Sequence, residues 1–197
     1  METLSIDVAR TALILIDLQH SNVTRSLAPY SGEEVVGNAV LLAQEMRERG
    51  GLVVYVRMLV NELLALPADV PLSGPVGATL PPPNASQLVP EAGVDAADLV
   101  ITKRQWGAFY GTELDQALRR RHISKIILGG IATNYSIEST ARAAFDRGYA
   151  LVFVEDAMTS LSAETHAFAC ENIFRHMGCV RKTGDVIDAL QAGTGEA

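Results

Sequence analysis

The feature that most constrains the fold is an alternation along the chain. Short runs that are apolar throughout, such as "ALILI" (12–16), "LVVYV" (52–56) and "IILGG" (126–130), are followed by longer amphipathic stretches. Strands without a polar face are typical of parallel sheets that are covered by helices on both sides. The alternation therefore predicts repeated βαβ units and an α/β fold with a parallel sheet.

The same reading divides most of the chain into elements. Strands are predicted at residues 11–17, 52–57, 98–103, 125–130, 150–156 and 179–183. Helices are predicted where apolar residues recur every three or four positions, at residues 33–50, 112–121, 134–148, 163–178 and 184–191. A chain of 197 residues is long enough for one domain with a substantial core, and we expect a single domain over 1–197.

Residues 58–97 break the alternation. They hold most of the prolines, including "PPP" at 81–83, and show no sustained period. Such a long irregular segment inside a compact domain is usually functional or mobile. We expect an excursion over one face of the sheet that serves as a substrate lid, an oligomer contact or a passive insertion.

The charge and composition of the chain indicate which kinds of partner and which compartment to expect. The net charge is −7, and the one dense basic run, "RRRH" at 119–122, is typical of a helix C-terminus, so nucleic acid is not expected as a partner. No apolar run reaches the length needed to cross a membrane, and no signal peptide is recognised, which predicts a cytoplasmic protein. The two cysteines, Cys170 and Cys179, are expected to be structural thiols in a reducing compartment.

Three polar residues stand where ligands usually bind in parallel sheets, beyond the carboxyl ends of strands. Asp17 ends the first predicted strand, Lys103 ends the third, and Ser136 follows the fourth in the first turn of a helix. Each has an ordinary explanation, as a turn residue, a surface lysine and a helix N-terminal serine. A carboxylate and an ammonium at neighbouring strand ends nevertheless predict a charge pair, and the three together predict a shared site.

Three segments make a family resemblance specific. "LILIDLQ", "TKRQWGAFYGTEL" and "GGIATNYSIESTARAAFDRGY" occur in order and resemble the signatures of the isochorismatase-like hydrolases, the cysteine hydrolase superfamily. The resemblance runs from about residue 12 to 190. It implies a three-layer α/β/α sandwich around a six-stranded parallel sheet, of Rossmann-like type, and a homo-oligomer acting on a small molecule.

The resemblance also assigns roles to residues. In amidases of the family an Asp, a Lys and a Cys form the catalytic triad, and these match Asp17, Lys103 and Ser136, so the cysteine is replaced here. A cis peptide bond is implied between Ile131 and Ala132, with the N–H groups of Ala132 and Ser136 forming an oxyanion hole. Whether the serine is natural or an engineered replacement stays open at this point.

Without the cysteine, three functions remain. A serine hydroxyl is far less acidic than a thiol, so we favour the isochorismatase branch, in which Asp17 acts as a general acid on a vinyl ether and water is the nucleophile. Side chains predicted to bind the substrate are Gln19, Trp106, Phe109 and Tyr135. The alternatives are an amidase with Ser136 as nucleophile and a non-catalytic metabolite-binding protein.

No metal or other cofactor is expected. Metal-binding members hold the ion with an Asp-x-His element, which this sequence lacks. His20 lies near Asp17, while the other histidines, His122, His166 and His176, fall in predicted helices or at their ends.

Overall fold

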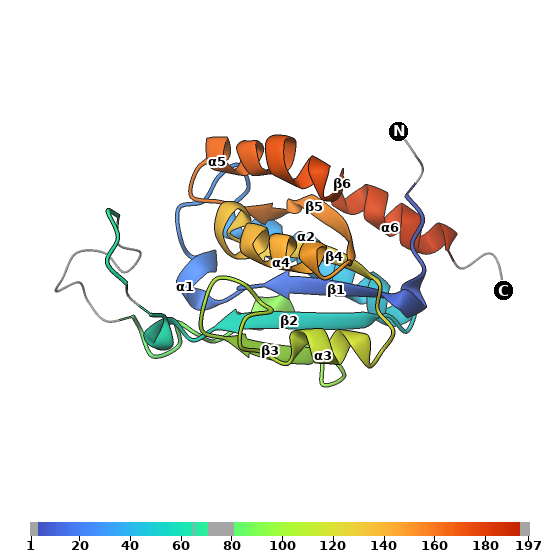
Figure 1. Cartoon of the computed structure of the whole chain (residues 1–197), viewed down its shortest axis with the longest axis horizontal. Helices are drawn as coiled ribbons and strands as arrows, with labels where there is room; N and C mark the ends of the chain where they lie inside the picture. Colours follow the sequence, from blue (N-terminus) through green and yellow to red (C-terminus); the bar gives the residue numbers. More distant parts are fainter. Residues whose placement is uncertain (1–3, 65, 71–80, 194–197) are drawn as a thin grey trace.

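The computed structural model describes residues 4–64, 66–70 and 81–193. Its centre is a six-stranded parallel sheet in the order β3-β2-β1-β4-β5-β6, which confirms the predicted fold class (Figure 1). The strands are β1 (Thr11–Ile16), β2 (Leu52–Met58), β3 (Leu99–Lys103), β4 (Lys125–Ile131), β5 (Ala150–Thr159) and β6 (Gly178–Arg181).

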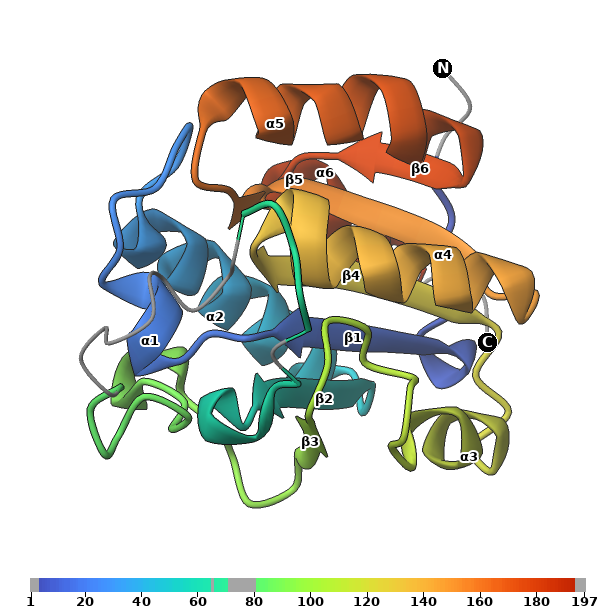
Figure 2. The ribbon, with the colours of Figure 1, turned by 60° about the vertical axis from the view of Figure 1, so that its left-hand side comes forward.

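Helices cover both faces of the sheet, which makes the fold a three-layer sandwich. On one face lie α2 (Gly32–Glu48) and α6 (Thr183–Ala192). On the other lie α3 (Leu114–Arg119), α4 (Glu138–Asp146) and the segment that begins with α5 (Ala163–Phe168). Figure 2 shows α4 running in front of β4, with α5 beside β6. The short α1 (His20–Val23) follows β1.

The core consists of two apolar clusters, one on each face of the sheet. All six residues of β1 are buried, as expected for a central strand of a parallel sheet. Ala12, Ile14 and Ile16 face the α3–α4 cluster, while Leu13 and Leu15 face the α2–α6 cluster. The strand that ends at Asp17 is therefore held rigidly from both sides.

The longest helix, α2, shows how local sequence sets an element. Ser31 and Glu34 form a reciprocal capping box, because the Ser31 hydroxyl accepts from the Glu34 N–H at 3.1 Å and the Glu34 carboxylate accepts from the Ser31 N–H at 2.7 Å. The helix then buries one apolar stripe against the sheet, made of Val35, Val36, Ala39, Leu42, Ala43 and Met46.

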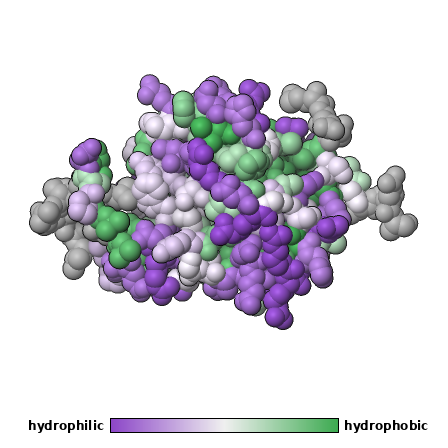
Figure 3. Space-filling model, in the orientation of Figure 1, coloured by the Kyte–Doolittle hydropathy of each residue, from purple (hydrophilic) through white to green (hydrophobic). Residues whose placement is uncertain are grey.

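Two predicted helices differ in detail from the observed ones. The helix expected at 134–148 begins with a π turn (Thr133–Ile137) and is α only over α4. The helix expected at 163–178 is α only over α5 and continues as a π turn (Ala169–Ile173) and a 3-10 turn (Phe174–His176). The basic run does lie at the end of α3, and the exposed Arg119, Arg120 and Arg121 contribute to a hydrophilic surface there (Figure 3).

The Pro-rich excursion over 58–97 begins at the carboxyl end of β2 and returns to the amino end of the parallel strand β3. Residues 65 and 71–80, which include part of this predicted segment, lie outside the described residues. Its later part packs closely, since Ala85, Val89 and Ala92 are buried and Leu88 forms an antiparallel bridge with Gln19. Within the described ranges, no helix is both long and apolar enough to cross a membrane.

Candidate active site

Asp17 occupies a sharp turn directly after β1. Its φ of +56° is in the left-handed region, which is uncommon for residues other than glycine but several-fold enriched for Asp. The Asp17 N–H still donates to the Val56 carbonyl oxygen of β2 at 2.7 Å. The turn therefore continues the sheet's hydrogen bonding for one residue while it redirects the chain, and the carboxyl group is left almost wholly buried.

The structure brings Asp17, Lys103 and Ser136 together. The Lys103 Nζ atom lies 2.7 Å from Asp17 Oδ2 and 3.0 Å from Ser136 Oγ, to which it donates. The Ser136 hydroxyl in turn donates to Asp17 Oδ2 at 2.7 Å. All three residues are buried. This is the convergence at neighbouring strand ends that the spacing predicted.

The Lys103 ammonium uses all of its hydrogen-bond donors within the protein. Its third donor position is used by the Trp106 carbonyl oxygen, which lies 2.6 Å from Nζ. An ammonium has three donors and no acceptor, so all of them have partners here. Lys103 therefore acts as a fixed positive charge rather than as a free ligand for a substrate.

Asp17 has one oxygen without a partner. Asp17 Oδ1 is the one buried side-chain oxygen or nitrogen in the described part of the chain that lacks a hydrogen bond. Such an atom needs an explanation, because desolvation without compensation is costly. Burial raises the pKa of the Asp17 carboxyl, and this outweighs the opposing effects of the Lys103 charge and of the hydrogen bonds from Lys103 and Ser136. A carboxyl of this kind can hold a proton at Oδ1 and present it to a substrate.

Ser136 belongs to a turn over Ile131–Ile137, which we call the catalytic turn. The Ile131–Ala132 peptide bond is cis, as the family resemblance implied. After it, Thr133–Ile137 form a π turn, in which the Tyr135 and Ile137 N–H groups both donate to the Ala132 carbonyl oxygen at 3.2 Å. An oxyanion hole at the Ala132 and Ser136 N–H groups stays a prediction.

A buried threonine joins this turn to the loop after β3. Thr140 Oγ1 donates to the Ser136 carbonyl oxygen at 2.7 Å and accepts from the Ala108 N–H at 3.0 Å. The loop that receives the Lys103 ammonium and the turn that carries Ser136 are therefore fixed relative to each other. Sequence reasoning missed Thr140, because a threonine inside a helix gives no signal of a tertiary partner.

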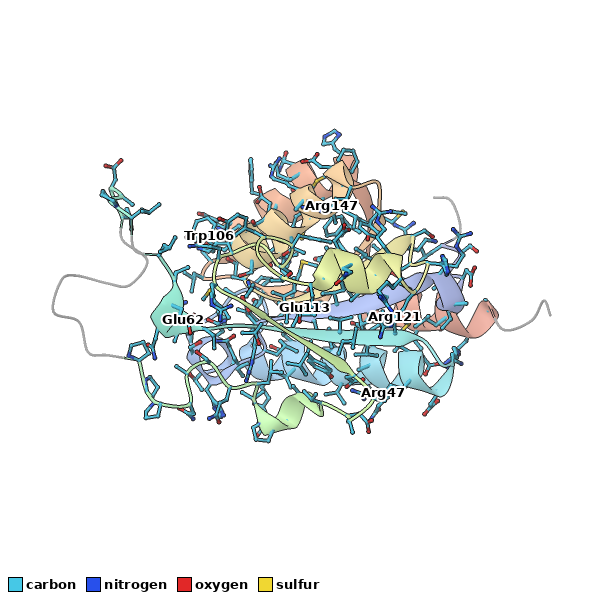
Figure 4. The ribbon with its side chains drawn as sticks, turned by 60° about the horizontal axis from the view of Figure 1, so that its bottom comes forward. Arg47, Glu62, Trp106, Glu113, Arg121 and Arg147 are labelled. Atoms are coloured by element: carbon cyan, nitrogen blue, oxygen red, sulfur yellow. The ribbon has the colours of Figure 1, made fainter. Side chains whose placement is uncertain are left out.

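Two of the predicted substrate-binding residues, Trp106 and Tyr135, contact each other and are not buried. The Trp106 and Tyr135 rings make an edge-to-face contact, with centroids 5.1 Å apart and an interplanar angle of 85°. Trp106 is 37% exposed. Figure 4 places Trp106 at the same end of the molecule as Glu62, which forms an ion pair with Arg104, the residue after Lys103. The aromatic pair is therefore accessible from solvent.

The other two predicted substrate-binding residues, Gln19 and Phe109, make contacts within the protein. The Gln19 amide accepts from the Met58 N–H and donates to Met58 O, Ala85 O and Ser21 Oγ, which ties the excursion to the sheet. Phe109 is buried in the core and stacks on Tyr149, with 5.9 Å between centroids. These contacts favour structural roles for Gln19 and Phe109 over the substrate binding that we predicted.

Among the residues that the structure describes, no group of three or more His, Cys, Asp or Glu side chains is arranged to hold a metal ion. Chemistry at this site is therefore considered in terms of the carboxyl, ammonium and hydroxyl groups present.

The parallel sheet and the buried carboxyl–ammonium–hydroxyl cluster are the arrangement that the resemblance to the isochorismatase-like hydrolases implied. Residues 11–188 match the isochorismatase domain, and the chain belongs to the isochorismatase family. It is 42% identical to the isochorismatase family protein YwoC of Bacillus subtilis (strain 168), over 97% of this chain and 100% of YwoC.

Two further comparisons give the range of similarity. An isochorismatase family protein from Burkholderia thailandensis superposes with a TM-score of 0.89 at 39% identity, over 96% of this chain and 100% of that one. The ureidoacrylate amidohydrolase RutB of Enterobacter sp. (strain 638) is 39% identical over 105 residues, which is 53% of this chain and 44% of RutB.

Proposed function

We propose that this hydrolase cleaves a small vinyl ether of the isochorismate type, with Asp17 as general acid and water as nucleophile. The observation that carries the proposal is the buried Asp17 carboxyl with an unpartnered Oδ1. A general acid must hold its proton near the working pH, and burial raises the pKa of Asp17 in that direction.

The reaction balances with these groups alone. Asp17 transfers its proton to the terminal methylene carbon of the enol ether, which leaves an oxocarbenium ion and an Asp17 carboxylate. Water adds to the cation and loses a proton to the carboxylate, which restores the acid. The resulting hemiketal then breaks its C–O bond to give a ketone and an alcohol. The Lys103 charge stabilises the carboxylate formed after the first step.

Ser136 has a supporting role in this scheme. Its hydroxyl donates to Asp17 Oδ2, which leaves Oδ1 as the oxygen that can carry the proton. Since a serine hydroxyl stays protonated beside a carboxylate and an ammonium, no covalent intermediate is required.

Two substitutions test the proposal. Asp17→Asn should lower turnover of a vinyl ether by about 1000-fold, because proton transfer typically contributes a factor of 100 to 10,000. Ser136→Ala should retain turnover within about tenfold, since two hydrogen bonds of the hydroxyl are lost, to Asp17 Oδ2 and from Lys103 Nζ, while the Asp17 acid itself stays. Steady-state rates, with circular dichroism to verify folding, give the measurement. Unchanged rates in Asp17→Asn would reject the general-acid role.

A second candidate is an amidase in which Ser136 attacks a carbonyl carbon. The distance of 2.7 Å between Ser136 Oγ and Asp17 Oδ2 favours it, because a base in hydrogen-bond contact could take the hydroxyl proton. The similarity to RutB, an amidohydrolase by name, points the same way.

Ser136→Ala and Ser136→Cys separate the two candidates. In a serine amidase, Ser136→Ala abolishes amide hydrolysis, and Ser136→Cys retains or raises it. In the general-acid hydrolase, Ser136→Ala still cleaves the vinyl ether. Amide hydrolysis by wild type that is lost in Ser136→Ala would establish the amidase and reject the first proposal.

A further inference from the structure

We propose that His166 is a positioning residue, which holds the beginning of the catalytic turn through Thr133, whereas Asp17 and Lys103 bind Ser136 near its end. This inference rests on the proposed function, since it takes the turn that carries Ser136 as part of the working site. His166 lies in α5, on a segment far from the turn in sequence, and its side chain is buried.

The contact between His166 and the turn is direct. His166 Nδ1 lies 2.8 Å from the Oγ1 atom of Thr133, a residue with no solvent exposure. Thr133 comes directly after the cis Ile131–Ala132 peptide bond and begins the π turn that ends after Ser136. The hydrogen bond therefore acts at the point where the chain leaves β4 and enters the turn.

The imidazole is itself held on its other sides. His166 Nε2 lies 3.6 Å from Cys170 Sγ, one turn later along the same helical segment. The Tyr30 ring contacts the imidazole edge-to-face, at 5.9 Å between centroids and 85° between planes. Side chains that position a site work best when their own orientation is fixed by packing and hydrogen bonds, and His166 meets that condition.

A neutral His166 imidazole fits the contacts with Thr133 and Cys170. Burial lowers the pKa of His166, opposed by the charge of Glu155 and reinforced by that of Lys182. Burial also raises the pKa of Cys170 to about 12, so the thiol keeps its proton. A neutral imidazole has one donor and one acceptor nitrogen, which matches a hydroxyl on one side and a thiol on the other.

The turn is then fixed at three points. Ser136 Oγ is bound by Asp17 and Lys103, the Ser136 carbonyl oxygen is bound by Thr140, and Thr133 is bound by His166. The first two contacts act on the end of the turn that carries the hydroxyl. His166 is the one among these partners that fixes its beginning.

Hydrogen exchange tests the proposal without any substrate. His166→Phe keeps the volume and the packing on Tyr30 but removes the hydrogen bond to Thr133. We expect amide exchange in residues 132–140 to become about tenfold faster, because the N–H groups of Tyr135 and Ile137 depend on the turn. Exchange in residues 33–48, on the opposite face of the sheet, should stay unchanged.

Two variants provide the controls. His166→Asn places an amide where Nδ1 stood, so it should restore slow exchange in residues 132–140. Cys170→Ala removes a contact on the far side of the imidazole but leaves the His166–Thr133 hydrogen bond in place, so it should speed exchange in the turn much less than His166→Phe does. Unchanged exchange in His166→Phe, equal acceleration in residues 33–48, or a loosening of the turn by Cys170→Ala as large as that by His166→Phe would overturn the proposal.

Kinetics supply a second readout. With a vinyl ether substrate, His166→Phe should lower kcat by about three- to tenfold, no more than Ser136→Ala does, while KM changes little, and His166→Asn should recover most of kcat. Equal kcat values in His166→Phe and wild type would contradict a positioning role. Absence of turnover in wild type would reject the proposed function alone, and the exchange comparison would still decide the role of His166.

Discussion

Asp17 and Lys103 form an ion pair whenever the Asp17 carboxyl is ionised, as after proton transfer, and solvent is almost completely excluded from the pair, with side chains 1% and 0% exposed. Moving two charges out of water costs several kcal/mol for each ion, and their attraction repays this only with good geometry and further hydrogen bonds. Ser136 and the Trp106 carbonyl oxygen supply such bonds, but Asp17 Oδ1 has none. The pair is therefore better explained by chemistry than by stability.

We expect a strong energetic coupling between the two residues. Lys103→Met leaves the Asp17 carboxyl buried without its counter-charge, and Asp17→Asn leaves the Lys103 ammonium in the same state, so each should reduce the free energy of unfolding by about 3–5 kcal/mol. The double variant should lose clearly less than the sum of the two. Urea unfolding of the four proteins measures the coupling, and additive losses would contradict it.

Sequence reasoning could locate Asp17, Lys103 and Ser136 because each follows a strand, and the carboxyl ends of parallel strands meet at one edge. It could not decide on which side of the chain Gln19 and Phe109 point, since a turn directly after a strand has no fixed periodicity. The contact of His166 with Thr133 could not be predicted for a different reason. A histidine on a helix belongs to no sequence pattern that reveals a tertiary partner.

At the scale of elements, the pairing of β4 with β1 leaves no room for a side chain at Gly130, which lies beside Ile16. Gly130 has a φ of +127°, and a Cβ atom added there would lie 2.0 Å from the Ile16 carbonyl oxygen. Both facts require glycine at this position. The close approach directly precedes the catalytic turn, so the glycine also sets where that turn begins.

Gly130→Ala should therefore lower stability by at least about 3 kcal/mol, through overlap with β1 and a strained backbone. Gly37 is the matched control, because it lies inside α2 and a Cβ there would meet nothing within 4 Å. Gly37→Ala should raise stability by about 0.5–1 kcal/mol through helix propensity. Thermal unfolding of both variants gives the test, and a neutral Gly130→Ala would contradict the packing argument.

The boundaries of the helices show which features the local sequence pattern does not predict. The apolar runs predicted the strands because buried strands have no polar face to confuse the pattern. The start of the helix predicted at 134–148 and the end of the one predicted at 163–178 are π or 3-10 turns instead. Both irregular stretches are fixed by tertiary hydrogen bonds or packing, to which an α-helical periodicity is insensitive.

Across the whole molecule, the two apolar clusters share one set of strands. Successive residues of β1 point to opposite clusters, and β4 does the same with Ile126 and Ile127. Neither layer of helices can separate from the sheet without exposing strands that the other layer also needs. We therefore expect the two apolar clusters to unfold together.

We expect a single cooperative unfolding transition in urea. Far-ultraviolet circular dichroism reports on all elements, while fluorescence reports on Trp106, the one tryptophan, in the loop after β3. The two curves should share a midpoint and slope. A fluorescence change at clearly lower urea would show that the carboxyl edge melts separately from the sheet.

The Pro-rich segment could be delimited from the sequence but not placed. The lack of any hydrophobic period set residues 58–97 apart from the βαβ units, and in the structure β2 ends at Met58 and β3 begins at Leu99. The contacts that fix its later part come from Gln19 and from the apolar side chains of Ala85 and Val89, which meet partners distant in the chain.

The strand order also has a consequence for synthesis. Asp17 leaves the ribosome early, whereas Ser136, whose hydroxyl it binds, follows 119 residues later. Through that interval β1 has no β4 beside it, although all six of its residues are buried in the folded chain. A nascent chain that exposes "TALILI" is open to misassociation, because unpaired apolar strands aggregate readily. The cluster of Asp17, Lys103 and Ser136 can therefore form only after synthesis has passed Ser136.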